Sequence, residues 1–407
     1  MSHQFPTFPV ESESGDIVRQ EIMTAAHTIV VKVGTRVLTR PAGAVGAGTL
    51  DDERVAAIAN QLAELHHAGR QVVLVSSGAV AAGMGRLGWK ERPSDLARLQ
   101  AAAAVGQSGL IEAYNHALIP QGLNAAQVLL TAEDLQDRAR YLSVRNTLLA
   151  LFKVGAIPII NENDTVSVEE LKISFGDNDR LAALVTNLLQ APLMILLSDI
   201  DGLYDGNPAA EHTEVMPVVT DLETAQTELV HDSADVGRQG GGLSTGGMYS
   251  KLQATQIATS AGENVVIANG RRENVITRIL AGEEVGTLFL PEGRLVDARK
   301  RWIGWSAAPQ GKALLDAGAC RAVAEQGRSL LPVGITGVSG IFDSGDVISL
   351  CNESGQEFAR GLTNYTSVEL TKILGQPSDK IAEVLGHCPY RTVVHRDNLL
   401  VISETQT

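Results

Sequence analysis

The chain has 407 residues, of which 44% are hydrophobic, 20% charged and only 4% aromatic. This length fits one large domain plus a small one, or two to three domains of ordinary size, and the composition excludes wholesale disorder. With 47 acidic against 33 basic side chains, the formal net charge of −14 opposes a whole-surface role in coating nucleic acids or anionic membranes.

Residues 1–25 contain two prolines and a Ser/Glu cluster without hydrophobic periodicity, which predicts a flexible N-terminal extension. From Thr28 onward, short apolar runs alternate with long amphipathic or Ala-rich stretches. The predicted strands are Thr28–Val33, Gln71–Ser76, Ala126–Thr131, Ile157–Asn161, Leu193–Ser198, Asn264–Ala268 and Gly286–Leu290. Helices are predicted to begin near Asp51, Ser94, Tyr141, Asp179 and Met248. This alternation predicts an α/β fold with a mostly parallel central sheet covered by helices on both faces.

The pattern changes after Pro291, where short segments punctuated by glycine predict a small β-rich module. We place the boundary near residue 298, so that residues 26–297 form the large α/β domain and residues 298–407 form the module and tail. From Arg299 to the end there are 11 basic and 11 acidic residues, so the negative charge belongs to the upstream region.

All three cysteines lie in this C-terminal region, at positions 320, 351 and 388. Their odd number and the lack of a CxxC motif disfavour a disulfide framework or a zinc site and fit a reducing cytoplasm. No apolar run reaches the roughly 18 residues of a membrane span, and the polar start does not resemble a secretory signal. We therefore expect a cytoplasmic protein without a membrane partner.

Two strand ends in the first half suit the binding of anions. Lys32 lies near the end of a buried strand and is followed by the glycine turn at Gly34, so its ammonium group can reach a phosphate. A second buried strand ends in Ser77 and Gly78, whose small side chains leave backbone N–H groups accessible at a helix start. Either segment, taken alone, also fits an ordinary connection from strand to helix.

Three further segments carry polar or glycine-rich runs. Asn161-Glu162-Asn163-Asp164 and the run Gly176–Arg180 can bind an amino group, position other charges or meet a metal, although Asn178 or Asp179 also fits a helix N-cap. Ser198-Asp199 closes a strand where a nucleotide base and ribose could be held. The run Gly237–Lys251 has six glycines before a helix and can close over phosphates, but it is not a Walker A motif.

Together these five segments resemble the amino acid kinase family, and most closely its glutamate 5-kinase branch, whose members begin proline biosynthesis. The resemblance covers about residues 27–290, and its most specific parts are VKVGT, VSSGAV, AAVGQ, IPIINENDTV, GDND and TGGMYSK. In the tail, RKRWI, SLLPVGI and VHRDN resemble the PUA module that many bacterial enzymes of this branch append. The resemblance implies the three-layer αβα amino acid kinase fold plus a small β-rich PUA domain.

The resemblance also implies an activity and roles for individual residues. ATP, with Mg²⁺, phosphorylates the side-chain carboxylate of L-glutamate to give L-glutamyl 5-phosphate. Lys32 and Lys251 flank the transferred group and Asp179 orients them. Ser77, Asp164 and Asn178 bind glutamate, and the backbone of Gly34 and Gly78 faces the phosphates or the substrate. The nucleotide contacts are Lys32, Ser198, Asp199, Thr245, Gly246, Gly247, Met248, Tyr249, Ser250 and Lys251.

Elementary chemistry is consistent with this activity. The acceptor carboxylate has a reference pKa of about 4.3, so it is ionised at neutral pH and requires no general base. The reaction instead requires that repulsion between an anion and a polyphosphate be cancelled, which two lysines and Mg²⁺ can do. The sequence assigns no residue as a metal ligand.

Several alternatives stay open at this point. Related kinases phosphorylate acetylglutamate, aspartate, carbamate or UMP, but the run Asn161–Asp164 and the PUA-like tail disfavour them. RNA binding by the tail is disfavoured because its charge is balanced and its basic side chains are scattered; a packing or regulatory role would place Trp302, Trp305 and Phe342 in a core or interface. Family members are often dimers or tetramers, so we expect a homo-oligomer. The segment Val168–Phe175, slightly longer than in the family, could shape glutamate affinity or feedback inhibition by L-proline.

Overall fold

The computed structural model describes residues 12–40, 48–166, 178–206, 213–222, 247–291, 300 and 302–402. The chain divides into two compact units. The first comprises Met1–Leu135 and Ala139–Arg294, and the second comprises Leu295–Thr407 with Gln136–Arg138. Each unit has its own sheet and hydrophobic core, and each is described here by itself.

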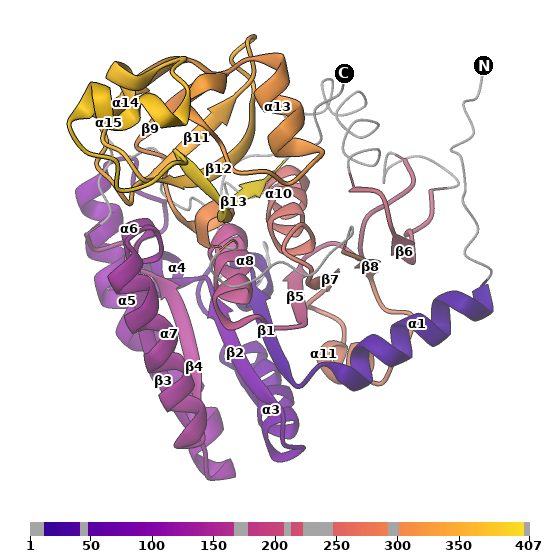
Figure 1. Ribbon diagram of the computed structural model, residues 1–407. Coiled ribbons are helices and arrows are strands. Elements are labelled where there is room, and N and C mark those ends of the chain that lie inside the picture. The colour runs from indigo at the N-terminus through magenta and orange to yellow at the C-terminus, as the bar shows by residue number, and fades with distance from the viewer. Residues whose placement is uncertain are drawn as a thin grey trace. The chain divides into compact units, whose positions relative to one another are not determined.

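The first unit is built on an eight-stranded sheet of order β3-β4-β2-β1-β5-β7-β8-β6 (Figure 1). Its strands are β1 (Thr28–Val33), β2 (Gln71–Ser76), β3 (Asn124–Leu130), β4 (Ala156–Glu162), β5 (Leu193–Ser198), β6 (Val218–Val219), β7 (Asn264–Asn269) and β8 (Thr287–Phe289). All neighbouring strands run parallel except the pair β7 and β8. The prediction of a mostly parallel central sheet is confirmed.

Helices cover both faces of this sheet. The helices of this part of the chain are α1 (Ser12–Ala25), α2 (Thr35–Leu38), α3 (Asp52–His67), α4 (Ala79–Leu87), α5 (Leu96–Leu118), α6 (Ala132–Gln136), α7 (Arg138–Lys153), α8 (Asn178–Leu189), α10 (Met248–Thr259) and α11 (Val275–Leu280). Helices α3 and α5 pack on each other and on one part of the sheet, whereas α8 packs on β1, β2, β4 and β5 and against α10. All six residues of β1 and of β5 are buried, as expected for central strands with helices on both faces.

The crossing of α4 and α5 depends on two glycines. A Cβ atom added to Gly83 would lie 1.7 Å from the carbonyl oxygen of Ala102, and one added to Gly106 would lie 1.7 Å from that of Ala79. The two backbones are therefore closer than any side chain allows. Because Ala79 begins α4, this contact fixes the helix start that follows the turn at Ser77 and Gly78.

The N-terminal segment differs from the flexible extension that the sequence predicts. Residues Ser12–Ala25 form α1, and its Arg19 and Met23 side chains are only 1% exposed. Arg19 Nη2 donates to the carbonyl oxygen of Pro217 at 2.7 Å. Arg19 can be buried because its guanidinium group donates to backbone carbonyls. It therefore occupies a buried position of the helix at which a hydrophobic pattern would have an apolar residue. Residues 1–11 lie outside the described part of the chain.

The second unit contains a five-stranded sheet of order β10-β9-β11-β12-β13. Its strands are β9 (Gly311–Leu315), β10 (Ile335–Gly340), β11 (Val347–Cys351), β12 (Glu357–Thr363) and β13 (Val394–Val401), and its helices are α13 (Ala317–Ala324), α14 (Ser367–Ile373) and α15 (Ile381–Leu385). Phe342 lies in its core with Tyr365 and Phe358. The predicted small β-rich module is confirmed. The Trp302 side chain lies outside what the structure describes.

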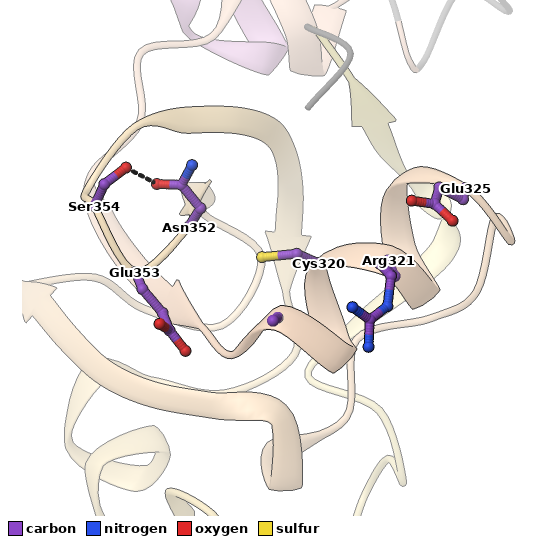
Figure 2. Close-up of a pocket in the computed structure, with 7 residues that line it drawn as sticks. Cys320, Arg321, Glu325, Asn352, Glu353 and Ser354 are labelled. Carbon is purple, nitrogen blue, oxygen red and sulfur yellow. Dashed lines mark hydrogen bonds between the residues drawn. The ribbon is translucent and has the colours of Figure 1, made fainter. Parts of the chain in front are cut away.

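A hollow of about 240 Å³ opens in this second unit between α13 and the turn after β11. Figure 2 shows Arg321 and Glu325 on the helix, facing Asn352, Glu353 and Ser354 on the turn, with the sulfur of Cys320 between them. Two carboxylates and one guanidinium give it mixed charge, so its lining favours neither an anionic nor a cationic ligand. All three cysteines are free thiols. Within the described ranges, no helix combines the length and apolar character needed to cross a membrane.

Candidate active site

Two lysines from distant parts of the chain meet at one buried aspartate. Lys32, on β1, places its Nζ 2.5 Å from Asp179 Oδ1, and Lys251, in the first turn of α10, places its Nζ 3.3 Å from Asp179 Oδ2. The side chains of Lys32, Lys251 and Asp179 are 4%, 7% and 0% exposed. Since Asp179 belongs to the first turn of α8, three separate elements assemble the cluster. The convergence predicted for Lys32, Lys251 and Asp179 is therefore present.

The electrostatics of this cluster favour an anionic ligand. One carboxylate faces two ammonium groups, so this buried group of three carries an excess of one positive charge. Electrostatic interactions are stronger where water is excluded, and a polyphosphate entering here would meet cations that are already oriented. Ser250 Oγ lies 3.4 Å from Asp179 Oδ2 and belongs to the same α10 turn as Lys251. The arrangement is suited to stabilising charge on a phosphoryl group.

A second cluster, of asparagine and serine, lies beside it. Asn178 Nδ2 lies 2.9 Å from Ser77 Oγ, 2.9 Å from Asn161 Oδ1 and 3.2 Å from the carbonyl oxygen of Ser76. The ends of β2, β4 and the start of α8 are thereby joined through one amide group. The structure brings the predicted residues Ser77 and Asn178 together and adds Asn161, which the sequence places only in a polar run.

Two buried atoms of this cluster have no hydrogen-bond partner among the described residues: Asn161 Nδ2 and Asn178 Oδ1. One is a donor and the other an acceptor. Buried polar atoms are nearly always paired in folded proteins, so an unpaired one needs an explanation such as a ligand. The pair is complementary to a small molecule that carries both acceptor and donor groups, as an amino acid does.

Asp164 follows β4 and is half-buried. Burial raises the pKa of this carboxyl group to about 6, while the positive charge of Arg92 partly opposes that rise. A carboxylate under such conditions gains stability from a nearby cation, because the charged form is poorly solvated. An ammonium group of a ligand would supply this cation. This environment suits the predicted role of Asp164, which stays a prediction.

The glycine turns at Gly78 and Gly34 differ in backbone conformation and in hydrogen bonding. Gly78 has a φ of 103°, a left-handed conformation that favours glycine, and it immediately precedes α4. Gly34 N–H, however, donates to the carbonyl oxygen of Leu197 at 3.1 Å. Its amide is therefore used to join β1 to β5, and the prediction that the Gly34 amide faces the phosphates is wrong. A Cβ atom added to Gly34 would lie 3.7 Å from Lys32 Nζ, at ordinary van der Waals distance, so the turn lies directly beside that ammonium group.

On the other side of β1, Ser198 and Asp199 close β5. Asp199 Oδ1 accepts a hydrogen bond from Ser198 Oγ at 3.1 Å, and Asp199 Oδ2 accepts one from Arg36 Nη1 at 2.9 Å. Burial opposes ionisation of Asp199, but the hydrogen bond and charge of Arg36, together with hydrogen bonds from the backbone and from Ser198, outweigh it, so the pKa of Asp199 is lowered. Sequence reasoning missed Arg36, since its ion-pair partner lies 163 positions away.

Comparison with known protein families decides the family of the first unit. The model of the amino acid kinase family matches residues 27–269, more than half of the chain. The chain belongs to the amino acid kinase family. A PUA domain model matches residues 311–385 in the second unit. Both resemblances stated from the sequence are confirmed.

Individual relatives of this amino acid kinase are similar to it over nearly its whole length. A glutamate 5-kinase of Rhodopirellula baltica is 47% identical over 96% of this chain and 98% of its own length. A glutamate 5-kinase of Moorella thermoacetica is 46% identical over 93% of this chain and 97% of its own length. A crystal structure of UMP kinase from Ureaplasma parvum covers 65% of this chain and 98% of its own, with 14% identity and a TM-score of 0.44.

The glycine-rich segment of this amino acid kinase is only partly described. Thr245 and Gly246 lie outside the described residues, as does the segment Val168–Phe175. Gly247 precedes α10, and Tyr249 in its first turn is 64% exposed. Ser250 and Lys251 are the residues of this segment that the structure brings to Asp179. The predicted roles of Gly247, Met248 and Tyr249 stay predictions.

Proposed function

We propose that this protein transfers the γ-phosphoryl group of ATP to the side-chain carboxylate of L-glutamate. The product is L-glutamyl 5-phosphate, an acyl phosphate, and the reaction is the first step of proline biosynthesis. The observation that carries the proposal is the pairing of Lys32 and Lys251 with one buried carboxylate, Asp179. Relatives named glutamate 5-kinase, similar over nearly the whole chain, support the choice of acceptor.

The order of strands separates two binding regions around β1. Asn161 and Ser77 stand at the ends of β4 and β2, on one side of β1, and Ser198 ends β5 on the other. Ligands of parallel α/β sheets bind at the carboxyl ends of the strands. Glutamate therefore occupies the β2–β4 side and the nucleotide the β5–β7 side, so that the two meet at Lys32 and Lys251.

Glutamate is recognised by a carboxylate and by two amide atoms that have no hydrogen-bond partner among the described residues. Asp164 binds the substrate ammonium group, while Asn161 Nδ2 and Asn178 Oδ1 pair with polar atoms of the amino acid. The side-chain carboxylate of glutamate is already ionised and attacks phosphorus directly, so no residue has to remove a proton. The two ammonium groups offset the repulsion between this anion and the polyphosphate, and they stabilise negative charge as the phosphoryl group moves.

A magnesium ion fits this site as a companion of the nucleotide. Nowhere in the described part of the chain do three His, Cys, Asp or Glu side chains gather as metal ligands, and Asp179 is engaged by two lysines. Mg²⁺ commonly keeps several waters and binds substrate phosphates with few protein ligands. When bound together with the nucleotide, the ion would supply further charge neutralisation.

A substrate panel tests the proposed reaction. The full chain is incubated with ATP, Mg²⁺ and hydroxylamine, which traps acyl phosphates as hydroxamates, and L-glutamate is compared with acetylglutamate, aspartate, carbamate and UMP. For UMP and carbamate, ADP release is measured in parallel. We expect turnover with L-glutamate to exceed that with every other acceptor. Equal or greater turnover with another acceptor would refute the proposal.

The same proposal includes the organisation of the whole protein. Residues 26–297 form the catalytic domain, and residues 298–407 form the PUA domain and tail. The matches to the two family models, at residues 27–269 and 311–385, support this division. The protein acts in the cytoplasm as a homo-oligomer, a dimer or tetramer, is inhibited by L-proline and does not bind RNA. Sedimentation analysis, assays with added proline and an RNA mobility-shift assay test these statements separately.

A further inference from the structure

A network of ion pairs joins the carboxyl ends of β1, β5 and β7. Arg36, just after β1, pairs with Asp199 after β5 at 2.9 Å, and Arg272, after β7, pairs with Asp201 at 3.0 Å. Asn269 Nδ2 also donates to Asp201 Oδ1 at 3.0 Å. The network lies on the β5–β7 side of β1, where the nucleotide is proposed to bind. Arg36 belongs to neither the lysine cluster nor the asparagine cluster.

The Arg36 side chain starts from a backbone position that is itself held in place. Arg271 Nη2 donates to the carbonyl oxygens of Arg36 and Thr39, the latter at 3.0 Å. Arg54 Nη1 in turn donates to the carbonyl oxygen of Arg271 at 2.9 Å. The short helix α2, which carries Arg36, is thus tied to the end of β7 and to α3. Because its backbone is held in this way, Arg36 can keep its partner Asp199 in one orientation.

Asp199 is held through both of its oxygens. Arg36 donates to Oδ2 and Ser198 to Oδ1, which fixes the plane of the carboxylate. A carboxylate is an acceptor only, so the nucleoside groups it can bind are donors such as ribose hydroxyls. An uncompensated carboxylate at the carboxyl end of β5 would also repel a polyphosphate bound there. The guanidinium group of Arg36 removes this repulsion while it orients the acceptor.

We propose that Arg36 is a nucleotide-positioning residue, which holds Asp199 to accept hydrogen bonds from the nucleoside and cancels its charge toward the phosphates. The inference rests on the proposed function, because that function places the nucleotide on the β5–β7 side. The partner of Arg36, Asp199, follows β5, across β1 from Asn161 and Ser77, so Arg36 acts on ATP binding and not on glutamate binding. Its side chain donates to Asp199 and not to Asp179, the carboxylate that holds Lys32 and Lys251, so we expect it to affect ATP binding more than phosphoryl transfer.

Steady-state kinetics of three variants test this role. In Arg36→Ala we expect the KM for ATP to rise about tenfold, equivalent to loss of one charge-assisted hydrogen bond. We expect the kcat at saturating ATP and the KM for glutamate to stay within about twofold of wild type. Surface substitutions without a specific effect vary over about that range. Arg36→Lys restores part of the affinity because it keeps the charge, and Arg36→Gln restores less because it keeps only a donor.

Arg86→Ala is the matched control. Arg86 is exposed to the same degree as Arg36, 47% against 49%, and forms a comparable ion pair with Glu112 at 2.7 Å, but on α4 and α5. We expect it to leave the KM for ATP unchanged. A double-mutant cycle adds a second criterion: Asp199→Asn in the Arg36→Ala background should raise the KM for ATP less than it does alone.

Other results would overturn the inference. They are an unchanged KM for ATP in Arg36→Ala, an equal rise in the KM for glutamate, an equal effect of Arg86→Ala, or additive effects of Arg36 and Asp199. Thermal melting of each variant shows whether the fold is retained, and Arg36→Gln serves if Arg36→Ala is unfolded. Calorimetric titration with ATP separates this inference from the proposed function, since nucleotide affinity can be measured even in a chain that forms no acyl phosphate.

Discussion

The two polar clusters around β1 differ in whether their buried polar groups are paired within the protein. In the lysine cluster, Lys32 and Lys251 share Asp179, and all three side chains are almost completely buried. In the asparagine cluster, one amide group of Asn178 joins two strand ends, yet Asn161 Nδ2 and Asn178 Oδ1 have no described partner. In the first cluster both lysines are paired with a shared carboxylate, and the second retains unpaired hydrogen-bonding atoms among the described residues.

The difference follows from what each cluster must bind. Charges cannot be left unpaired in the interior, because the cost of desolvating an ion is several kcal/mol, so catalytic lysines need a permanent counterion. A neutral amide left unpaired costs only about 1–3 kcal/mol, and a substrate can recover that cost on binding. The protein therefore keeps its charged groups oriented at all times and leaves its amide groups to recognise the substrate.

The largest effect is expected for Asp179→Asn, which removes the counterion of both lysines. Two buried ammonium groups would then face a neutral amide, and loss of one partner from a buried ion pair costs about 3–5 kcal/mol of the free energy of unfolding. We expect this loss in a urea melt, together with loss of detectable hydroxamate formation. Asp95→Asn, which changes an exposed helix cap, is the control and should be neutral. Unchanged stability in Asp179→Asn would contradict the paired-charge account.

Lys251→Met is expected to affect catalysis more than stability. Asp179 would keep Lys32 as its counterion, and the methionine chain fills much of the same volume. We expect kcat to fall at least about 10²–10³-fold, as when a single donor to a developing charge is removed. The urea midpoint should change far less than in Asp179→Asn. Near-normal turnover in this variant would remove Lys251 from the catalytic set.

Asn178→Ala tests the asparagine cluster. Each hydrogen bond to a charged substrate group contributes about 1.5–3 kcal/mol, so we expect the KM for glutamate to rise about 10–100-fold with little change in the KM for ATP. Asn264→Ala is the matched control, because its side chain also donates to a backbone carbonyl but lies at the start of β7. An equal rise in both KM values would show that the two binding regions are not separate.

The smallest effect concerns pH and Asp164. Burial raises the pKa of this carboxyl group to about 6, so protonation below that pH removes the negative charge needed for the substrate ammonium group. We expect kcat/KM for glutamate to fall about tenfold per pH unit below this pKa. At saturating glutamate, kcat should fall only at lower pH, since the bound ammonium group lowers the pKa of Asp164. A pH profile that is the same in Asp164→Asn would assign the titration to another group.

The sequence predicted those parts of the fold that local pattern determines. Strands β1, β2 and β5 have the predicted bounds because each is a nearly continuous apolar run closed by a glycine or a small polar residue. Strand β6 was not predicted, because two residues, Val218–Val219, give no periodicity. Helix α1 was not predicted, since Arg19 occupies a buried position that hydrophobic patterning assigns to an apolar side chain.

The candidate site was predictable to the extent that motifs carry it. Lys32, Asp179 and Lys251 were assigned from the family resemblance, and their convergence needed no further information. The position of Gly34 was misjudged because a glycine turn does not reveal whether its amide is used by a neighbouring strand, here at Leu197. Arg36 could not be found from sequence, since an arginine after a strand is uninformative until the strand order places it beside Asp199.

A crystal structure with L-glutamate and a non-hydrolysable ATP analogue tests the central claim most directly. We predict that Lys32 Nζ and Lys251 Nζ both lie within about 3 Å of oxygens of the γ-phosphoryl group, the distance of charge-assisted hydrogen bonds. The glutamate side-chain carboxylate should face the same phosphorus from the side of Asn161 and Asn178. Lysine nitrogens directed into separate cavities, or only one of them at the γ-phosphoryl group, would contradict the account.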